Sequence, residues 1–332
     1  MGKCTILDIC KETGVSVATV SRVLNNSPRV TDETRTKILE AINRLGYKPN
    51  AAARNLSGRR SNVLGVIFHQ LTSGFYASVM SGIHLEARTR GYHLLVTLVH
   101  HADPERSSYY DMLDEARIDG LIVLDSTLDD ATLVKLQSYN RPIVLIERTS
   151  GNPAPATVGC ANEAAAHTAV SHLLSRGYRD MLIVTGPPEA EDSGLRMKGC
   201  QQALKDAGLS SADVKTISGN YSAHDAREAF RKHVDEQGLP RAVFAFNDDM
   251  ALSIMRELRV TGIDVPGQVA VVGFDGIEAA EYMGLTTMQM PMLELGAEAV
   301  RLLLERIKTP TTPARHVLKD CELVVRESSG GG

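Results

Sequence analysis

Seven short apolar runs constrain the possible folds of this 332-residue chain more than any other feature. The runs are rich in Val, Ile and Leu, and segments with the spacing of amphipathic helices separate them. They cover residues 63–68, 93–99, 120–124, 142–147, 181–186, 242–247 and 269–274. Uninterrupted apolar runs of this length are typical of parallel strands buried on both faces of a sheet. Because strand-helix-strand crossovers are right-handed, the pattern predicts doubly wound α/β layers.

The region that carries these runs is too long for one hydrophobic core. It comprises about 270 residues from position 61 onward, and single cores stop growing near this size. The sequence from Thr157 to Asn162 has the character of a passage between two parts. We therefore expect two parallel-sheet lobes that are joined near this passage.

The start of the chain has a different pattern. Thr5 is a good N-cap, and Asp8 follows it in the first helical turn. Gly14 can adopt the left-handed conformation that ends such a helix, and Ser16 can cap the next helix. A turn this short makes two helices cross steeply, as in a helix-turn-helix. A third helix, expected within residues 31–46, completes a small helical core.

The second of these helices has one face available for a partner. Val20, Val23 and Leu24 have the spacing of an inward face. The residues left on the outer face are Val17, Ala18, Ser21 and Arg22. In a helix-turn-helix, side chains at such positions meet the DNA major groove.

The charge distribution favours a nucleic-acid partner over an isolated helical bundle. Residues 1–60 hold eleven Lys or Arg and five Asp or Glu, a net of +6, so the rest of the chain carries −10 of the total of −4. A basic part on an acidic chain is suited to binding phosphates. We therefore interpret these residues as a DNA-binding unit, with a helical bundle that has no partner as the alternative.

Residues 49–60 form a separate short segment. Asn50 can cap a helix of about seven residues, Ala51 to Ser57, which is too short to be stable alone in water. A neighbouring copy and the DNA minor groove could support it, with Leu56 as a wedge between base steps and Arg54 near the phosphates. A plain linker is the alternative. The position directly after a helix-turn-helix favours the helix.

Five strings of sequence, in order over nearly the whole chain, resemble the LacI/GalR family of bacterial transcription regulators. They are GVSVATVSRVLNN, GYKPNAAARNL, SGLRMKG, FAFNDDMAL and VPGQVAVVGFDG. The resemblance implies a homodimer on a pseudo-palindromic operator, with a recognition helix in the major groove and a hinge-helix leucine in the minor groove. It places Val17, Ala18 and Arg22 at base-reading positions and Leu56 at the wedge position.

The motif and the resemblance together give the expected domains and DNA contacts. We expect a DNA-binding domain at 1–48, a hinge at 49–60 and an effector-binding and dimerisation core at 61–332. The family has three chain crossings between lobes of the periplasmic-binding-protein type. This implies a first lobe of about 61–160 and 291–318 and a second of about 161–290 and 319–328. The expected DNA contacts are Thr5, Ser16, Val17, Ala18, Thr19, Ser21, Arg22, Asn25, Asn50, Ala53, Arg54 and Leu56.

Residues that follow the predicted strands form a second group of candidates. Open parallel sheets bind ligands beyond the carboxyl ends of their strands. Aromatic faces with carboxylates, amides and arginines suit a sugar or another polyol, whose hydroxyls both donate and accept. The expected ligand contacts are Phe75, Tyr76, Asp125, Glu147, Arg148, Arg196, Tyr221, Asn247 and Asp275. The resemblance supports Arg196 and Asp275, which match effector-binding positions of the family.

Several of these candidates have purely structural alternatives. Asn247 and Asp248 can cap the helix that follows them. Glu147 and Arg148 can pair with each other or with nearby helices. Phe75 and Tyr76 can be ordinary packing within a lobe.

The sequence contains few features of an enzyme. It contains no GxSxG, no GxxxxGK and no GxGxxG after the first strand. His100 and His101 are adjacent, and His167 and His172 lack the i, i+4 spacing of a helical zinc pair, so we expect no metal and no cofactor. We expect a ligand-responsive transcription repressor. A sugar-binding protein or an enzyme on the same two-lobed fold is the alternative.

The composition favours a cytoplasmic protein without a membrane partner. The first ten residues, MGKCTILDIC, lack the apolar core of a secretory signal, which a periplasmic sugar-binding protein needs. No run reaches transmembrane length. The cysteines are odd in number and have no CxxC spacing, which favours reduced thiols. They are Cys4, Cys10, Cys160, Cys200 and Cys321.

Overall fold

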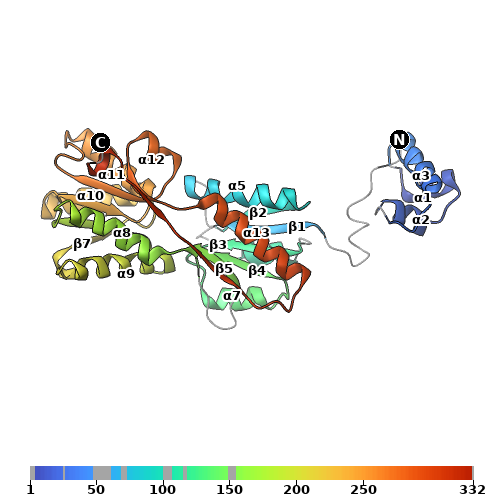
Figure 1. Ribbon diagram of the computed structural model, residues 1–332, viewed down its shortest axis with the longest axis horizontal. Coiled ribbons are helices and arrows are strands. Elements are labelled where there is room, and N and C mark those ends of the chain that lie inside the picture. Colours follow the sequence, from blue (N-terminus) through green and yellow to red (C-terminus); the bar gives the residue numbers. More distant parts are fainter. Residues whose placement is uncertain are drawn as a thin grey trace. The chain divides into compact units, whose positions relative to one another are not determined.

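The computed structural model describes residues 4–24, 27–47, 61–68, 73–99, 107–114, 118–148 and 155–330. The chain divides into two units, Met1–Ser61 and Asn62–Gly332. The first unit, which we call the head, contains α1 (Ile6–Thr13), α2 (Val17–Leu24) and α3 (Asp32–Leu45). The second unit, which we call the core, contains two six-stranded sheets (Figure 1). The expected hinge at 49–60 falls outside the described residues.

The helix ends of the head use the capping residues that the sequence predicts. The backbone N–H and the hydroxyl of Thr5 both donate to Asp8, at 2.8 Å each. Gly14 ends α1 with φ at +71°, where a side chain would be strained. The Ser16 hydroxyl accepts the N–H of Thr19 at 3.2 Å. The buried centre consists of Ile9, Val20, Val23, Ile38 and Ala41. The helix-turn-helix prediction is confirmed.

Lobe one of the core is built on the sheet with strand order β11-β5-β4-β3-β1-β2, in which neighbouring strands are parallel. Its strands are β1 (Val63–Phe68), β2 (His93–Leu98), β3 (Gly120–Leu124), β4 (Ile143–Ile146), β5 (Ala156–Cys160) and β11 (His316–Lys319). Its helices are α5 (Gly74–Thr89), α6 (Ser107–Asp114), α7 (Asp130–Gln137) and α13 (Met292–Lys308).

Lobe two is built on the sheet with strand order β12-β10-β9-β8-β6-β7, in which only β12 is antiparallel to its neighbour. Its strands are β6 (Met181–Thr185), β7 (Lys215–Ser218), β8 (Ala242–Ala245), β9 (Ala270–Asp275), β10 (Thr286–Gln289) and β12 (Glu322–Val324). Its α-helices are α8 (Asn162–Ser175), α9 (Glu191–Asp206), α10 (Ala223–Gln237), α11 (Asp248–Val260) and α12 (Glu278–Tyr282). Short 3-10 turns lie at Ser211–Asp213 and Glu327–Ser329. The predicted doubly wound α/β layers are confirmed.

The chain passes between the lobes three times. It leaves lobe one after β5, returns between β10 and α13, and leaves again between β11 and β12. We call these passages the first, second and third crossing. All three lie at the junction of the two sheets (Figure 1). The last two strands therefore belong to different sheets: β11 to the sheet of lobe one and β12 to the sheet of lobe two.

Helix α13 fixes α5 at close range, and α5 carries candidate ligand residues at its N-terminus. The two helices lie side by side (Figure 1). A Cβ atom added to Gly82 would lie 2.0 Å from the carbonyl oxygen of Leu293, and one added to Gly296 would lie 2.2 Å from that of Val79. Only glycine fits at these two points, so close backbone contact sets the position of α5.

One strand differs from the sequence-based expectation. The run at 93–99 is predicted to be buried on both faces, but β2 is an edge strand of its sheet, and three of its six residues are exposed and three are partly buried. Leu95 and Val96 are 40% and 37% exposed. An apolar run alone does not distinguish a central strand from an edge strand whose side chains remain open to a partner.

Candidate DNA interface and ligand cleft

The outer face of α2 presents the residues expected to read DNA. Val20 and Val23 are buried, which turns the opposite side of the helix outward. Val17 is 44% exposed, and Ala18 and Arg22 are also exposed. Thr19 and Ser21 are partly exposed. In the major groove, thymine methyl groups offer an apolar partner for a side chain such as Val17, and guanine offers acceptors for an arginine.

Other DNA candidates have structural roles or lie beyond the described residues. Thr5 and Ser16 cap helices and are themselves exposed, so capping leaves them accessible. Five further candidates fall outside the part of the chain that the structure describes. They are Asn25, Asn50, Ala53, Arg54 and Leu56.

A narrow cavity lies between the two lobes of the core. Its volume is about 40 Å³, room for about three water molecules. Residues from both lobes line it: Ser73, Phe75, Tyr76, Leu124, Ser126, Glu147, Asp192, Arg196, Tyr221, Asn247 and Asp275. Seven of the nine predicted ligand contacts are among them.

Arg196 is the centre of the polar network around this cavity. It is 3% exposed, and its Nε donates to the Asn162 side-chain oxygen at 2.8 Å. Its Nη1 donates to the carbonyl oxygen of Phe246. The guanidinium carbon also lies 3.8 Å from the centre of the Phe274 ring, a cation–π contact. The surroundings therefore fix the guanidinium plane from several sides.

Two carboxylates of lobe two face the same guanidinium. Arg196 Nη2 lies 3.6 Å from Asp192 Oδ2, and Nη1 lies 4.0 Å from Asp275 Oδ1. Burial raises the pKa of Asp275 well above its usual range, with Arg196 opposing the shift and Asp248 adding to it. The three groups form a buried ionisable set on one side of the cavity.

Glu147 connects lobe one to this network. Its Oε1 accepts the backbone N–H of Cys160 at 2.7 Å, and its Oε2 accepts the Asn162 amide at 2.7 Å. Burial raises the pKa of Glu147 to about 7, although Arg196 and Asn162 favour its ionised form. Asn162 begins α8 of lobe two. The hydrogen bond from Asn162 to Glu147 therefore joins the two lobes at the first crossing.

Tyr221 is connected to the same polar network. Its hydroxyl donates to Asp192 Oδ2 at 2.8 Å, and its ring lies against Gly186, where an added Cβ would be 2.3 Å from the ring. The other oxygen of that carboxylate, Asp192 Oδ1, is buried without a hydrogen-bond partner. A buried acceptor without a donor is costly, so this oxygen is ready for a donor from a ligand or from water.

Asn247 and Asp248 divide the two roles that the sequence left open. The Asn247 side-chain oxygen caps α11 by accepting the N–H of Met250 at 2.9 Å. Asn247 also lines the cavity. Asp248 accepts the backbone N–H groups of Gly276 and Ile277 at 2.8 and 2.9 Å. The Asp248 side chain therefore stabilises the turn after β9, the strand that ends at Asp275, and does not cap α11.

Phe75 and Tyr76 supply the aromatic wall of lobe one. Their rings are 5.3 Å apart in an edge-to-face arrangement, and Tyr76 makes a similar contact with Phe68 at 6.1 Å. Both line the cavity while packing against the core. The packing and ligand interpretations are thus compatible for both residues.

Unusual backbone conformations concentrate at the cavity. Six non-glycine residues in the described ranges have positive φ, and three of them line the cavity. These are Glu147 at 56°, Tyr221 at 56° and Asp275 at 116°. Such conformations cost of order 1–3 kcal/mol each and are found most often at functional sites. Three convergent examples support the cavity as a binding site.

Asp125 and Arg148 do not line the cavity. Asp125 accepts the hydroxyl of Tyr109 and the N–H and hydroxyl of Thr127, the last two at 2.9 and 2.7 Å, so it stabilises the loop after β3. Arg148 turns to Asp130 at 2.6 Å, at the start of α7. Each residue lies just after a strand, but its side chain bonds to groups of lobe one outside the cavity lining.

Comparison with known proteins identifies the chain. Residues 5–50 match the family of bacterial regulatory proteins, lacI family, and residues 170–329 match a periplasmic binding protein-like domain. The chain is 30% identical over 327 residues to the HTH-type transcriptional repressor PurR of Photobacterium profundum, covering 98% of each protein. The chain belongs to the LacI family.

Two solved structures of transcription regulators resemble this one along their whole length. The lac repressor dimer bound to operator and the anti-inducer ONPF matches with a TM-score of 0.87 and 26% identity, over 98% of this chain and 99% of that one. A complex of the transcriptional regulator CelR with cellobiose matches with a TM-score of 0.73 and 29% identity, over 98% and 100%. This LacI-family chain is accordingly a ligand-responsive, DNA-binding transcription repressor, not an enzyme.

Asp192 lines the cavity but is not among the predicted ligand contacts. It lies on α9, which begins at Glu191. Asp192 and Arg196 are therefore four residues apart on one helix and share a face. The i, i+4 spacing was the available signal.

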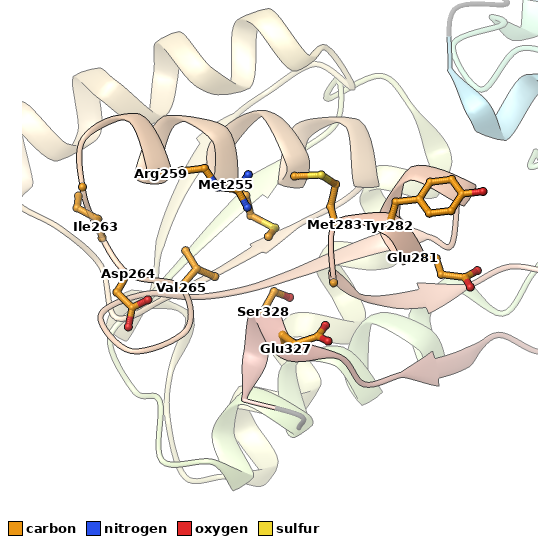
Figure 2. A pocket seen from close by; sticks show the side chains of 12 residues that line it. Met255, Arg259, Ile263, Asp264, Val265, Glu281, Tyr282, Met283, Glu327 and Ser328 are labelled. Atoms are coloured by element: carbon orange, nitrogen blue, oxygen red, sulfur yellow. The ribbon is translucent and has the colours of Figure 1, made fainter.

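A second, larger hollow of about 650 Å³ lies in lobe two, away from the cleft residues. Figure 2 shows Met255 and Arg259 of α11 on one side and Glu281 and Tyr282 of α12 on another. None of the predicted ligand contacts lines it. Within the described ranges, no group of three or more His, Cys, Asp or Glu could hold a metal ion, and no helix is long and apolar enough to cross a membrane.

Proposed function

We propose that this LacI-family repressor binds a neutral sugar between its lobes and, as a homodimer, binds a pseudo-palindromic operator. The observation that carries the ligand proposal is the composition of the cavity wall. It holds three carboxyl groups and one guanidinium, and burial raises the pKa of two of the carboxyl groups, those of Glu147 and Asp275. Such a wall offers both hydrogen-bond acceptors and donors, which match the hydroxyls of a neutral sugar.

The buried Asp192 oxygen is the most specific element of that wall. Asp192 Oδ1 has no partner, while Oδ2 already accepts from Tyr221. A ligand hydroxyl that donates to Oδ1 would remove the cost of the unpaired acceptor. Arg196 beside it could donate to ring or hydroxyl oxygens of the same ligand.

Aromatic side chains support the same ligand class. Phe75 and Tyr76 form one wall and Tyr221 part of another. The C–H faces of a sugar ring are apolar and can lie against aromatic rings, while its hydroxyls meet the polar groups. The CelR–cellobiose complex shows that a protein of this fold can hold a disaccharide.

The size of the cavity supports a coupling between ligand and lobe arrangement. A volume of about 40 Å³ is far below the several hundred Å³ of ordinary ligand pockets. A sugar would therefore bind only if the lobes open or shift. A ligand that prefers one lobe arrangement changes its population, and DNA affinity changes with it.

We assign DNA recognition to α2 and to the segment 49–60. Val17, Ala18 and Arg22 would read bases in the major groove, and Leu56 would open a minor-groove step. The domain limits 1–48, 49–60 and 61–332 belong to this proposal.

Exposed apolar side chains on both lobes support the homodimer. Leu95 and Val96 stand open on the edge strand β2, and Tyr282 and Met283 of lobe two are 76% and 39% exposed. Figure 2 shows the last two beside the larger hollow. A symmetric partner would cover such patches and place two heads on a palindrome.

A thermal-shift screen of the full-length protein tests the ligand proposal. Neutral mono- and disaccharides, including cellobiose, would be compared with sugar phosphates and nucleobases. A neutral sugar should raise the melting temperature by mass action and alter DNA binding, whereas the phosphates should not. Stabilisation by phosphorylated sugars alone would refute the neutral-sugar assignment, and turnover of a bound sugar would favour an enzyme.

The DNA proposal needs a separate test. Operator sequences selected from a random pool should be pseudo-palindromic. Arg22→Ala should then relax the base preference at one position in each half-site, at a cost of about 1–3 kcal/mol. A uniform loss for all sequences would reassign Arg22 to phosphate contact.

A further inference from the structure

Asn162 is a buried residue at the first crossing that contacts two residues of the cavity wall. It is 4% exposed and does not itself line the cavity. Its side-chain nitrogen donates to Glu147 Oε2 at 2.7 Å, and its side-chain oxygen accepts the N–H of Arg196 Nε at 2.8 Å. The two ends of one short amide are therefore bonded to ligand candidates of the two lobes.

Glu147 is held on the side of lobe one. Its backbone N–H donates to the Val158 carbonyl oxygen of β5 at 3.0 Å. Its Oε1 accepts the N–H of Cys160, the last residue of β5, at 2.7 Å. The second oxygen, Oε2, is the one that meets Asn162. The Glu147 carboxylate therefore moves with the sheet of lobe one.

Asn162 and Arg196 are held together on the side of lobe two. They belong to α8 and α9, two helices that pack against each other. A Cβ atom added to Gly199 of α9 would lie 2.0 Å from the carbonyl oxygen of Glu163, the residue after Asn162. Because this backbone contact is so close, the two helices move as one body. The hydrogen bond between Asn162 and Glu147 is the point where that body meets lobe one.

The guanidinium of Arg196 connects this hydrogen bond to the cavity. Its Nε and Nη1 donate to Asn162 and to the Phe246 carbonyl oxygen. The contacts of Nη2 are longer, at 3.6 Å to Asp192 Oδ2 and 4.0 Å to Met290 Sδ. Nη2 is therefore well placed to donate to a ligand oxygen. Because the guanidinium is a rigid plane, a turn at Nη2 also turns Nε.

We propose that Asn162 is a positioning residue that ties Arg196 to Glu147 and so transmits a change at Arg196 to the lobe arrangement. This role rests on the proposed ligand cleft. A ligand oxygen on Nη2 turns the guanidinium, and the Asn162 amide then cannot keep both of its hydrogen bonds. The bond to Glu147 crosses between the lobes, so its loss favours a more open arrangement than the one with the cavity of about 40 Å³.

An exchange of the two partners tests the bond between Glu147 and Asn162. In Glu147→Gln, one orientation of the introduced amide places its NH₂ group against the NH₂ group of Asn162, and the other places it against the N–H of Cys160. Either orientation loses a hydrogen bond. Adding Asn162→Asp supplies an acceptor for the introduced NH₂ group and still accepts from Arg196. The double variant therefore rebuilds the chain of bonds with donor and acceptor exchanged.

Arg196→Lys tests the other end of the chain. Lysine keeps the positive charge but lacks the Nε donor, so the Asn162 oxygen loses its partner. Glu147→Gln and Arg196→Lys should each raise the ratio of open to closed protein by about tenfold, the effect of losing one charge-assisted hydrogen bond. The double variant Glu147→Gln with Asn162→Asp should return the ratio to within about twofold of wild type.

Pulsed electron paramagnetic resonance of the full-length protein measures the lobe separation. Val134→Cys on α7 and Lys232→Cys on α10 carry the nitroxide labels at exposed positions of the two lobes. Cys4→Ser, Cys10→Ser and Cys321→Ser remove the native thiols that are not fully buried. An excess of unlabelled protein suppresses distances between two molecules.

The four proteins are compared first without sugar. A wild-type distance distribution in Glu147→Gln or in Arg196→Lys would overturn the role of Asn162, as would a double variant displaced as far as Glu147→Gln. Cellobiose is then added, and it should lengthen the distance in the wild type and change it little in Glu147→Gln. If cellobiose leaves every distribution unchanged, the sugar proposal loses support, while the sugar-free distances still decide the role of Asn162.

Discussion

The two lobes contribute different chemistry to the cleft. Lobe one presents an aromatic wall, two serine hydroxyls and a single carboxylate: Ser73, Phe75, Tyr76, Leu124, Ser126 and Glu147. Lobe two presents a connected polar set: Asp192, Arg196, Tyr221, Asn247 and Asp275. The polar set is held in place by hydrogen bonds within lobe two, whereas the aromatic wall is held by packing. Lobe two is therefore suited to determine which hydroxyls are recognised, and lobe one to cover the ligand.

Substitution of Arg196 should produce the largest effect and tests whether lobe two dominates recognition. Arg196→Ala leaves Asp192, Asp275 and Asn162 without their cationic partner in a buried site, at a cost of about 3–5 kcal/mol. We expect a lower melting temperature and at least a ~100-fold loss of sugar affinity by calorimetry. Arg196→Lys should keep the charge but lose the fixed donor geometry, giving an intermediate loss. Unchanged affinity in both variants would remove Arg196 from the site.

Glu147, the one carboxylate that lobe one contributes to the cavity, should contribute to the pH dependence of stability. Its pKa is 4.5 in an ordinary environment and about 7 in the folded protein. Between these values the folded chain keeps a proton that the unfolded chain has released, so stability falls as pH rises through this window, by about 3 kcal/mol. Asp248, whose pKa burial also raises to about 7, contributes in the same direction.

Glu147→Gln removes one of these two titrating groups. The free energy of unfolding, measured with urea at pH 5, 6, 7 and 8, should then depend less steeply on pH than in the unsubstituted protein. Asp248→Asn provides the matched comparison, because it should reduce the slope similarly without touching lobe one. A slope that Glu147→Gln leaves unchanged would show that Glu147 ionises near its ordinary pKa.

Asp192→Asn tests the unpaired oxygen of lobe two at lower cost to the fold. Asparagine keeps the shape, and its oxygen can still accept from Tyr221, but an NH₂ group replaces the buried acceptor. We expect a loss of sugar affinity of about 1.5–3 kcal/mol, because the ligand hydroxyl loses a charged acceptor. Tyr221→Phe serves as the control for the internal hydrogen bond alone. Equal affinities for wild type and Asp192→Asn would contradict a ligand contact at Oδ1.

Phe75→Ala tests the covering role of lobe one. Loss of an aromatic face should weaken sugar binding by about 1–2 kcal/mol, chiefly through faster dissociation, and should leave the pattern of preferred sugars unchanged. Arg88→Ala, on the exposed end of the same helix, is the control. A changed order of sugar preference would show that lobe one also selects hydroxyls.

Arg148→Ala should have the smallest effect. Arg148 pairs with Asp130, whose side chain is 81% exposed, and it does not line the cavity. The Arg148 side chain itself is only 11% exposed, so its removal costs some packing, but the exposed Asp130 limits the ion pair to about 0–1 kcal/mol. Sugar affinity should remain within about twofold of wild type. A loss of tenfold or more would restore Arg148 to the set of ligand contacts.

The sequence predicted the apolar strands well and the remaining strands poorly. The seven runs correspond to β1, β2, β3, β4, β6, β8 and β9, with small differences at the ends. Strands β7 and β11, with the sequences KTIS and HVLK, are exposed edge strands, so they lack an apolar run. Strand β5, ATVGC, is fully buried but consists of small residues. Its position between two other strands, not its composition, makes it a strand.

The rule that ligands meet the carboxyl ends of strands worked for some positions and failed for others. It placed Glu147, Asn247 and Asp275 at the cavity. It also selected Asp125 and Arg148, whose side chains bond to their own lobe. Strand position fixes where the backbone ends, but the direction of each side chain depends on the loop that follows. That loop geometry, including the positive φ of Glu147, is not encoded in a local pattern.

The last two strands also affect the order in which the protein can fold during synthesis. Strand β11 completes the sheet of lobe one beside β5, and β12 then completes the sheet of lobe two beside β10. Both strands lie within residues 316–324 and follow all the other strands of the two sheets in the sequence. While the ribosome is still translating, each lobe therefore exposes an unpaired strand edge, the kind of surface that invites misassembly. Proteolytic loss of this one short segment would open the edges of both lobes at once.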